Sequence, residues 1–242
     1  MWLALSGILL LFVFAYGVLR LSRARTFQLF GGITHRVDTP DKRIALTIDD
    51  GPVPGATESL LALLHRHGAR ATFFLIGADI ERYPELARAI ARAGHQIGNH
   101  SFSHHRMIFK SPRFVREEVE KTNRAIRTIG YTGPIPFRPP YGKKLLYLPY
   151  YLRTQGIPTI MWDIEPDSYD DIAASSDRIV AHVRDRVQAG SIILLHAMNR
   201  EPSLLAMEPL LEQLGQQGYR FVTVSELLTP APLERQDQVP PS

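Results

Sequence analysis

The stretch Arg43-Ile-Ala-Leu-Thr-Ile-Asp-Asp-Gly-Pro52 decides the fold. It is a short apolar run that ends in two adjacent carboxylates and then in turn-forming residues. The apolar part has the length and the β-branched content of a buried strand. Taken alone, Asp49 and Asp50 are better explained by a tight turn than by chemistry, because Asp-Gly is common in turns.

Six further apolar runs of this kind follow along the chain, at 71–76, 96–98, 135–137, 158–162, 192–195 and 219–224. The segments between them carry helix start and stop signals, such as Pro84 with Gly94, Ser111-Pro112 with Gly130, and Ser175-Ser176-Asp177 with Gly190. About seven strands that alternate with helices predict an α/β domain with a parallel sheet, either open or closed into a barrel.

Composition excludes several classes of protein. The chain has 242 residues and a formal net charge of +4, but residues 41–228 hold 23 Lys plus Arg against 21 Asp plus Glu. No long basic run with interleaved aromatic residues is found, so we expect no nucleic-acid partner. The sequence has no cysteine, so any metal must be held by histidines and carboxylates.

The amino-terminal segment predicts a membrane anchor. Residues 2–19 carry no charged side chain, and a helix of that length spans about 27 Å. A cleaved secretory signal is the alternative, but no charge precedes the run and no small-x-small cleavage site follows it. We therefore expect a hydrophobic anchor with a basic flank over 1–25, a linker over 26–40, a catalytic domain over 41–228 and a disordered tail over 229–242.

Polar side chains lie just past the ends of five predicted strands. They are Asp49 and Asp50, His100 and His104, Arg138, Asp163, and His196. Because the carboxyl ends of parallel strands carry the active site in barrels and in open α/β sheets, we expect these side chains to meet.

His100 and His104 have metal-ligand spacing. Four residues apart on a helical turn, they would face the same side, and with Asp50 they form a two-histidine, one-carboxylate set. Such a set leaves coordination positions open, as in catalytic sites. We expect one divalent metal ion, with Zn²⁺ as the default, while His105 is interpreted as a surface residue.

The remaining motifs are weaker when taken singly. Phe137-Arg-Pro-Pro-Tyr-Gly142 is a stiff loop in which Arg138 could reach a carboxylate and a backbone N–H could stabilise an oxyanion; the alternative is a structural loop with a surface arginine. In Trp162-Asp-Ile-Glu-Pro-Asp-Ser168, any of three acids could orient a catalytic histidine, although at least one is expected only to be solvated. His196 could donate a proton to a leaving group, or could be a core residue.

Together, Thr-Ile-Asp-Asp-Gly, His-Ser-Phe-Ser-His, Arg-Pro-Pro-Tyr and Leu-Leu-His, in this order, resemble the motifs of the NodB-homology polysaccharide deacetylases, carbohydrate esterase family four. The resemblance covers residues 41–228. It implies a distorted (β/α) barrel with about seven parallel strands, here preceded by the transmembrane or signal-anchor helix, and a metal-dependent enzyme that removes acetyl groups from N-acetylated sugars.

The resemblance also implies residue roles. Asp49 matches the catalytic base, Asp50, His100 and His104 match the metal ligands, and Arg138 matches the arginine that tunes the base. The Tyr141 backbone matches the oxyanion donor and His196 the general acid. The acidic motif departs from the family pattern, so Asp163 and Glu165 both stay open as the acid that orients His196.

The predicted partners are an acetylated glycan and, through the amino-terminal helix, a membrane. Two alternatives remain open: a metal-dependent amide or ester hydrolase of a non-sugar substrate, and a catalytically silent, membrane-tethered carbohydrate-binding protein.

The side of the membrane on which the catalytic domain lies is predicted differently by two arguments. The positive-inside rule favours a cytoplasmic domain, because the apolar run is followed by Arg20, Arg23 and Arg25. A polymeric substrate favours a periplasmic or extracytoplasmic domain, and we expect the latter. The sequence does not indicate an oligomeric state.

Overall fold

The computed structural model describes residues 2–230, and the predicted tail lies outside the described residues from 231 onward. The seven strands are β1 (Ile33–Thr34), β2 (Arg43–Asp49), β3 (Thr72–Leu75), β4 (Gln96–Asn99), β5 (Thr159–Ile160), β6 (Ile192–Leu195) and β7 (Arg220–Val222). All the strand pairs are parallel, in the order β4-β3-β2-β6 with β7 beside the first half of β2, and β1 beside β5. The predicted parallel α/β architecture is therefore confirmed.

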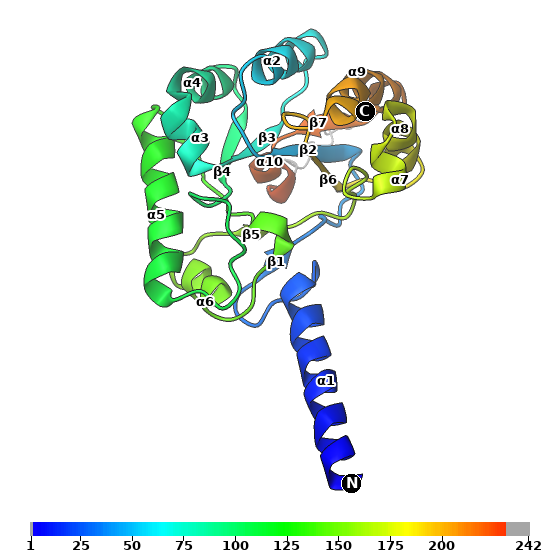
Figure 1. The fold of residues 1–242 in the computed structure, drawn as a ribbon. Helices are drawn as coiled ribbons and strands as arrows, with labels where there is room; N and C mark the ends of the chain where they lie inside the picture. Colours follow the sequence, from blue (N-terminus) through cyan, green and yellow to red (C-terminus); the bar gives the residue numbers. More distant parts are fainter. Residues whose placement is uncertain (1, 231–242) are drawn as a thin grey trace, which may run out of the picture.

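Helices surround the strands on most sides (Figure 1). Their bounds are α1 (Trp2–Arg23), α2 (Ala56–Arg66), α3 (Gly77–Arg82), α4 (Pro84–Arg92), α5 (Pro112–Thr128), η1 (Pro140–Gly142), α6 (Tyr147–Thr154), α7 (Asp170–Ala173), α8 (Ser176–Arg184), α9 (Glu201–Gln216) and α10 (Val224–Leu228). The predicted first-turn proline of α4 and the Ser111 N-cap of α5 are both found. The third predicted helix, α8, ends at Arg184, six residues before Gly190.

The core explains why β2 is the central strand. All seven of its residues are buried, because β3, β6 and β7 flank it and helices cover its faces. Ile44, Leu46 and Ile48 of β2 belong to the largest apolar cluster, which also contains Leu60 and Leu64 of α2. The chain thus has a rigid central strand, and that strand ends at Asp49.

Two strand predictions and the linker prediction need correction. Residues 135–137 form no strand, since Pro134, Pro136 and Pro139 have no N–H to donate, and only Phe137 makes bridges, to Asn99 and to Thr159. Instead a strand, β1, lies within the segment 26–40 that was predicted to be a linker. The run at 219–224 is cut short at Val222, because Thr223 and Glu226 form a capping box that begins α10.

A closed barrel is not confirmed. Phe137 links β4 to β5 through single bridges, and Ile164 links the segment after β5 to β6 in the same way. These contacts connect the strands in the order that a closed barrel would require. Each is a single bridge, however, and not a ladder of successive hydrogen bonds.

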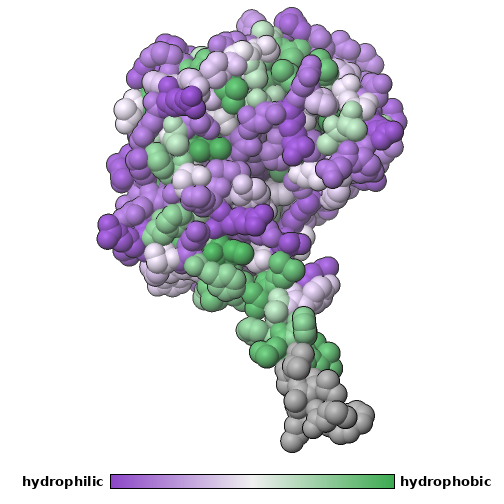
Figure 2. Space-filling model, in the orientation of Figure 1, coloured by the Kyte–Doolittle hydropathy of each residue, from purple (hydrophilic) through white to green (hydrophobic). Residues whose placement is uncertain are grey.

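Helix α1 projects from the domain (Figure 1), and its apolar side chains at 9–14 are exposed. Figure 2 shows apolar surface on this helix and next to its base, with mostly hydrophilic surface over the rest of the visible face. Among the residues that the structure describes, no helix is long and apolar enough to cross a membrane. The predicted transmembrane span and membrane partner are therefore not supported.

Candidate active site

The turn after β2 separates the two adjacent carboxylates. Asp49 is the last residue of β2 and is 2% exposed, so its side chain faces the interior. Asp50 has a positive φ of 72° and its backbone N–H donates to Phe74 O on β3 at 3.1 Å. Because the backbone turns between the two residues, Asp49 points toward Arg138 and Asp50 toward the two histidines.

A loop, and not the expected helical turn, brings His100 and His104 together. Both follow β4, and His104 has a positive φ of 56°. The Ser101 hydroxyl accepts a hydrogen bond from the backbone N–H of His104 at 3.1 Å, and Ser101 N–H donates to Asn99 Oδ1 at 2.8 Å. The loop is thus held by its own side chains, so that four-residue spacing gives a shared ligand position without a helix.

Glu118 of α5 fixes the same loop from outside. Its carboxylate accepts hydrogen bonds from the backbone N–H groups of Phe102 and Ser103 at 2.9 and 2.8 Å, and from the Ser103 hydroxyl at 2.7 Å. Glu118 is 6% exposed, which is unusual for a glutamate and is explained by these three donors. Sequence reasoning missed this residue, since nothing in α5 marks it apart from other acids.

Asp50, His100 and His104 offer one ligand atom each, all within 4.8 Å of one another. Asp50 Oδ1 lies 3.3 Å from His104 Nε2 and 3.8 Å from His100 Nε2, and the two Nε2 atoms are 3.2 Å apart. Asp50 Oδ1 is buried without a hydrogen-bond partner among the described residues. A buried carboxylate oxygen without a donor, facing two imidazole nitrogens, is well suited to a cation.

The hydrogen bond of His100 and the pKa of His104 agree with this assignment. His100 Nδ1 lies 2.8 Å from the carbonyl of Arg138, so it donates there and leaves Nε2 free as a ligand. Burial and then the charge of His100 lower the pKa of His104 to about 4. Its ring is therefore neutral at pH 7, as metal binding requires. The residues present fit one divalent metal ion.

Arg138 and Asp49 form a buried ion pair. Arg138 Nη1 donates to Asp49 Oδ1 at 2.6 Å and to Thr47 Oγ1 at 2.8 Å, while Nη2 donates to Met161 O at 3.1 Å. The guanidinium is fully buried and stacks on Phe74 at 4.1 Å. Burial lowers the pKa of Arg138, and the charge of Asp49 opposes this shift. The predicted contact between Arg138 and a carboxylate is found, and Asp49 Oδ2 stays 3.6 Å from His100 Nε2.

Asp167 is the acid that contacts His196, so Asp163 and Glu165 were the wrong candidates for that role. Asp167 Oδ1 lies 3.0 Å from His196 Nδ1. Asp163 instead accepts from the Ser191 hydroxyl and from Ile192 N–H, each at 2.8 Å. Glu165 pairs with Arg25 Nη2 at 2.5 Å and accepts from Trp162 Nε1 at 2.8 Å.

Charge around His196 favours its protonated form. Burial opposes the charge, but the hydrogen bond and negative charge of Asp167, with the charges of Asp49 and Asp50, raise the pKa of His196 to about 9. Asp167 is itself fully buried and accepts two further hydrogen bonds, from the backbone N–H of His196 at 2.6 Å and from Ser203 Oγ at 2.7 Å. His196 is therefore a cation at neutral pH, in the form that donates a proton.

Tyr141 lies in η1 with a positive φ of 56° and its side chain is 57% exposed. Its ring stands 4.7 Å from the His104 ring. Of the five non-glycine residues with positive φ in the described chain, four lie in the loops around this site: Asp50, Ser101, His104 and Tyr141. Backbone strain of this kind gathers at functional sites, because the surrounding structure must hold it.

All these loops open into one cleft of about 900 Å³, lined by Asp49, Asp50, His100, His104, Tyr141, Trp162 and His196 among others. Asn199, which sequence reasoning did not select, also lines the cleft and donates to Asp50 Oδ2 at 3.0 Å. The predicted residues Asp49, Asp50, His100, His104, Tyr141 and His196 are thus brought together. Arg138 lies behind them and Asp163 does not line the cleft.

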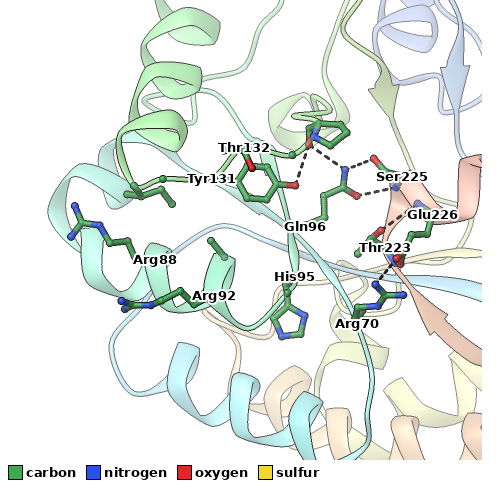
Figure 3. Close-up of a pocket in the computed structure, with 16 residues that line it drawn as sticks. Arg70, Arg88, Arg92, His95, Gln96, Tyr131, Thr132, Thr223, Ser225 and Glu226 are labelled. Carbon is green, nitrogen blue, oxygen red and sulfur yellow. Dashed lines mark hydrogen bonds and ion pairs between the residues drawn. The ribbon is translucent and has the colours of Figure 1, made fainter.

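A second hollow of about 600 Å³ lies near the start of β4 and contains none of the predicted site residues (Figure 3). Several of its polar groups are bonded to one another. Gln96 pairs with Ser225 through both amide atoms, at 2.5 and 3.0 Å, and Arg70 pairs with Glu226 at 2.5 Å. These contacts tie α10 to the sheet, which explains them without a ligand.

The fold and the cleft define a parallel α/β protein with an open two-histidine, one-carboxylate site at the strand ends, beside an aspartate paired with a buried arginine and a positively charged histidine. The polysaccharide deacetylase family model matches residues 36–160. The chain belongs to this family, and it is accordingly a hydrolase, a polysaccharide N-deacetylase.

Individual relatives agree with the family. The chain is 35% identical over 200 residues to a peptidoglycan-N-acetylglucosamine deacetylase of Bacillus cereus, covering 82% of this chain and 93% of the relative. It is 34% identical over 192 residues to the peptidoglycan-N-acetylmuramic acid deacetylase PdaC of Bacillus subtilis, where it covers 79% of this chain and only 40% of the relative. A crystal structure of the Bc1960 peptidoglycan N-acetylglucosamine deacetylase superposes with a TM-score of 0.76 at 29% identity, covering 81% of this chain and 92% of that one.

Proposed function

We propose that this enzyme is a metal-dependent deacetylase that releases acetate from N-acetylglucosamine-type residues of a cell-envelope glycan. One observation carries the proposal: a carboxylate base, an open metal-ligand set and a protonated histidine line a single cleft. Relatives named for peptidoglycan N-acetylglucosamine and N-acetylmuramic acid support a cell-wall glycan as the substrate class.

Asp50, His100 and His104 would hold the metal ion, with Zn²⁺ as the proposed species. A metal bound there supplies Lewis-acid chemistry, which lowers the pKa of a water molecule and polarises a carbonyl. Asn199 orients Asp50 through its second carboxylate oxygen, and the Arg138 carbonyl fixes the ring of His100. Such outer contacts keep the ligand atoms pointed at one position.

The chain's own residues move the protons. Asp49 accepts the proton of the attacking water, and its pairing with Arg138 keeps one oxygen fixed while Oδ2 remains available. The Tyr141 N–H donates to the developing oxyanion. His196 then donates its Nε2 proton to the amine nitrogen as the C–N bond breaks, because Nδ1 is held by Asp167. Water and the acetamide become acetate and a free amine.

Acetate release tests the proposal. N-acetylated chito-oligosaccharides, peptidoglycan and aryl acetates are assayed with enzyme stripped by a chelator and with enzyme reloaded with Zn²⁺. We expect release from the glycans, loss on stripping and recovery on reloading. Full activity of metal-free enzyme would refute the metal assignment, and hydrolysis of aryl acetates alone would favour a non-sugar hydrolase.

Two variants separate the roles of the adjacent acids. Asp49→Asn is expected to keep the metal, as measured by elemental analysis, but to lose about 10²–10⁴-fold in turnover. Asp50→Asn is expected to lose the metal. Metal-replete wild-type protein that releases no acetate from any acetylated glycan would instead favour a silent carbohydrate-binding protein.

We also propose an extracytoplasmic location for the catalytic domain, since a polymer of the cell wall is met outside the cytoplasm. A reporter fused after Ser242 tests it: activity of a reporter that works only outside the cytoplasm is expected, and activity of a cytoplasm-only reporter would contradict it.

A further inference from the structure

The rim of the catalytic cleft is rich in cations. Five of its lining residues are lysine or arginine, contributed by four separate parts of the chain: Arg23, Arg25, Arg106, Lys143 and Arg200. The acids that line the cleft are fewer: Asp49, Asp50 and Glu165. Each of these acids already has a positive or metal-binding partner, because Asp49 pairs with Arg138, Glu165 pairs with Arg25, and Asp50 belongs to the proposed metal site.

Four of the rim cations are left without a counter-charge. Within the part of the chain that the structure describes, no acid lies within ion-pair distance of Arg23, Arg106, Lys143 or Arg200. Some exposed arginines elsewhere in the domain are paired, as Arg66 is with Glu208 at 2.6 Å, and others are not; these four cations differ in that they all line one cleft. The cleft entrance therefore carries a positive field that the protein does not neutralise.

Three of these cations are crowded on the Tyr141 side of the cleft. The Arg106 guanidinium lies 5.1 Å from the Tyr141 ring, which in turn packs beside His104. Burial, together with the positive charges of Arg23 and Arg106, lowers the pKa of Lys143. Like charges held this close repel one another, and an anion between them would remove that cost.

The chain holds this cluster in place. Lys144 N–H donates to Ser22 O at 3.1 Å, and the buried Lys144 ammonium donates to Ala24 O. Arg25 stacks over Trp162 at 4.9 Å while it pairs with Glu165. The segment 22–25 at the end of α1 is thus a wall of the cleft, in addition to being the connection to α1.

We propose that Arg23, Arg106 and Lys143 form a subsite for a carboxylate on the sugar next to the acetylated residue, and so select an acidic glycan over a neutral one. This inference rests on the proposed deacetylase function. A carboxylate is the anion proposed because arginine binds its two oxygens through two parallel hydrogen bonds, while the second arginine and the lysine add positive charge around it.

Acetate release from matched glycans tests the subsite. A β-1,4-linked oligosaccharide of N-acetylated sugars that carries a lactyl carboxylate on alternate residues is compared with the same oligosaccharide amidated at that carboxylate. We expect kcat/KM to be about tenfold higher for the acid, and the ratio to shrink as salt is raised. Equal rates for both would overturn the proposal. A higher rate for a matched oligosaccharide that bears a 6-phosphate would overturn the choice of carboxylate.

Variants locate the effect. Arg106→Gln/Lys143→Gln and, separately, Arg23→Gln are expected to lower the acid-to-amide ratio about threefold or more, mainly through KM. Arg116→Gln removes an exposed cation of α5, outside the cleft, and is expected to keep the ratio. The subsite would be refuted if the double variant and the Arg23→Gln variant both had the wild-type melting temperature and both kept the wild-type acid-to-amide ratio of kcat/KM.

A binding arm separates this inference from the proposed function. Calorimetric titration of Asp49→Asn protein with the acid and amide glycans measures recognition without turnover. If wild-type enzyme releases no acetate but the acid glycan still binds about tenfold tighter, the deacetylase proposal fails and the anion subsite stands. If acetate is released and both glycans bind equally, the deacetylase proposal stands and the anion subsite fails.

Discussion

Asp167 Oδ1 lies 3.0 Å from Nδ1 of His196, and the other oxygen of the same carboxylate accepts the backbone N–H of His196 at 2.6 Å. One carboxylate therefore holds both the ring and the main chain of the histidine. With Nδ1 occupied, the proton on Nε2 faces the cleft. This relationship gives a buried acid the task of orienting the proposed proton donor.

Asp167→Asn is expected to lower kcat about 100-fold or more, because the amide neither fixes the protonated ring nor stabilises its charge. The pKa of His196 should fall, so the alkaline limb of the pH–rate profile should move to lower pH. Asp163→Asn is the matched control, since Asp163 bonds Ser191 and Ile192 and not the histidine. Its alkaline limb should stay in place. If Asp163→Asn moved the limb and Asp167→Asn did not, the assignment would be reversed.

The same pair should make stability depend on pH. The pKa of His196 is raised to about 9 in the fold from an ordinary value of 6.5. Its contribution is therefore fully present below about pH 6.5 and is lost as pH rises through about 9, and the full shift corresponds to about 3 kcal/mol. Urea unfolding of metal-free protein at pH 6 and pH 9 measures it. In Asp167→Asn the decline between these two pH values should be much smaller, and an equal decline would contradict the linkage.

Much of the site could be predicted from the sequence because its residues follow buried strands. Asp50, His100 and His196 come directly after β2, β4 and β6, and parallel strands end at the same edge. The choice among Asp163, Glu165 and Asp167 could not be predicted in this way. It depends on which donors the surrounding chain presents, and the donor to Asp163 is Ser191, 28 residues away.

Two features of the fold also could not be predicted from local sequence patterns. β1 has two residues and exists because Ile33 and Thr34 pair with β5, far along the chain. The contacts of Lys144 with Ser22 and Ala24 are likewise long-range. Composition alone does not indicate such contacts, and the segment after α1 was therefore predicted to be a linker. The loss of a strand at 135–137, by contrast, follows from the prolines around it.

Breaking the ion pair between Arg138 and Asp49 should destabilise the enzyme strongly. Arg138→Met leaves Asp49 buried without its partner, and we expect a loss of about 3–5 kcal/mol in the free energy of unfolding, measured with urea. Arg138→Met/Asp49→Asn should recover part of this loss, because the uncompensated charge is gone. A double variant that is no more stable than the single Arg138→Met would show that an uncompensated charge on Asp49 is not the source of the cost.

Asn199→Ala should weaken metal binding without removing a ligand. The side-chain amide of Asn199 donates to Asp50 Oδ2 and thereby aims Oδ1 at the two histidines. We expect the metal dissociation constant to rise about 10- to 100-fold, measured by competition with a chromogenic chelator. Gln216→Ala, an exposed change at the end of α9, serves as the control and should leave affinity unchanged. Equal affinity in both variants would mean that Asn199 does not orient Asp50.

Gly190→Ala should be among the most destabilising single changes outside the site. Gly190 has a φ of +80°, and a Cβ there would stand 1.7 Å from the carbonyl oxygen of Val37, which cannot move freely because Val37 N–H bonds Gly190 O at 2.9 Å. We expect a loss of more than about 2 kcal/mol in the free energy of unfolding by urea. Gly215→Ala is the matched control. Gly215 lies inside α9 with open space around its Cβ position, so alanine should stabilise the protein by about 0.5–1 kcal/mol. If both substitutions changed stability in the same direction, the close approach of Val37 to Gly190 would not be what requires glycine there.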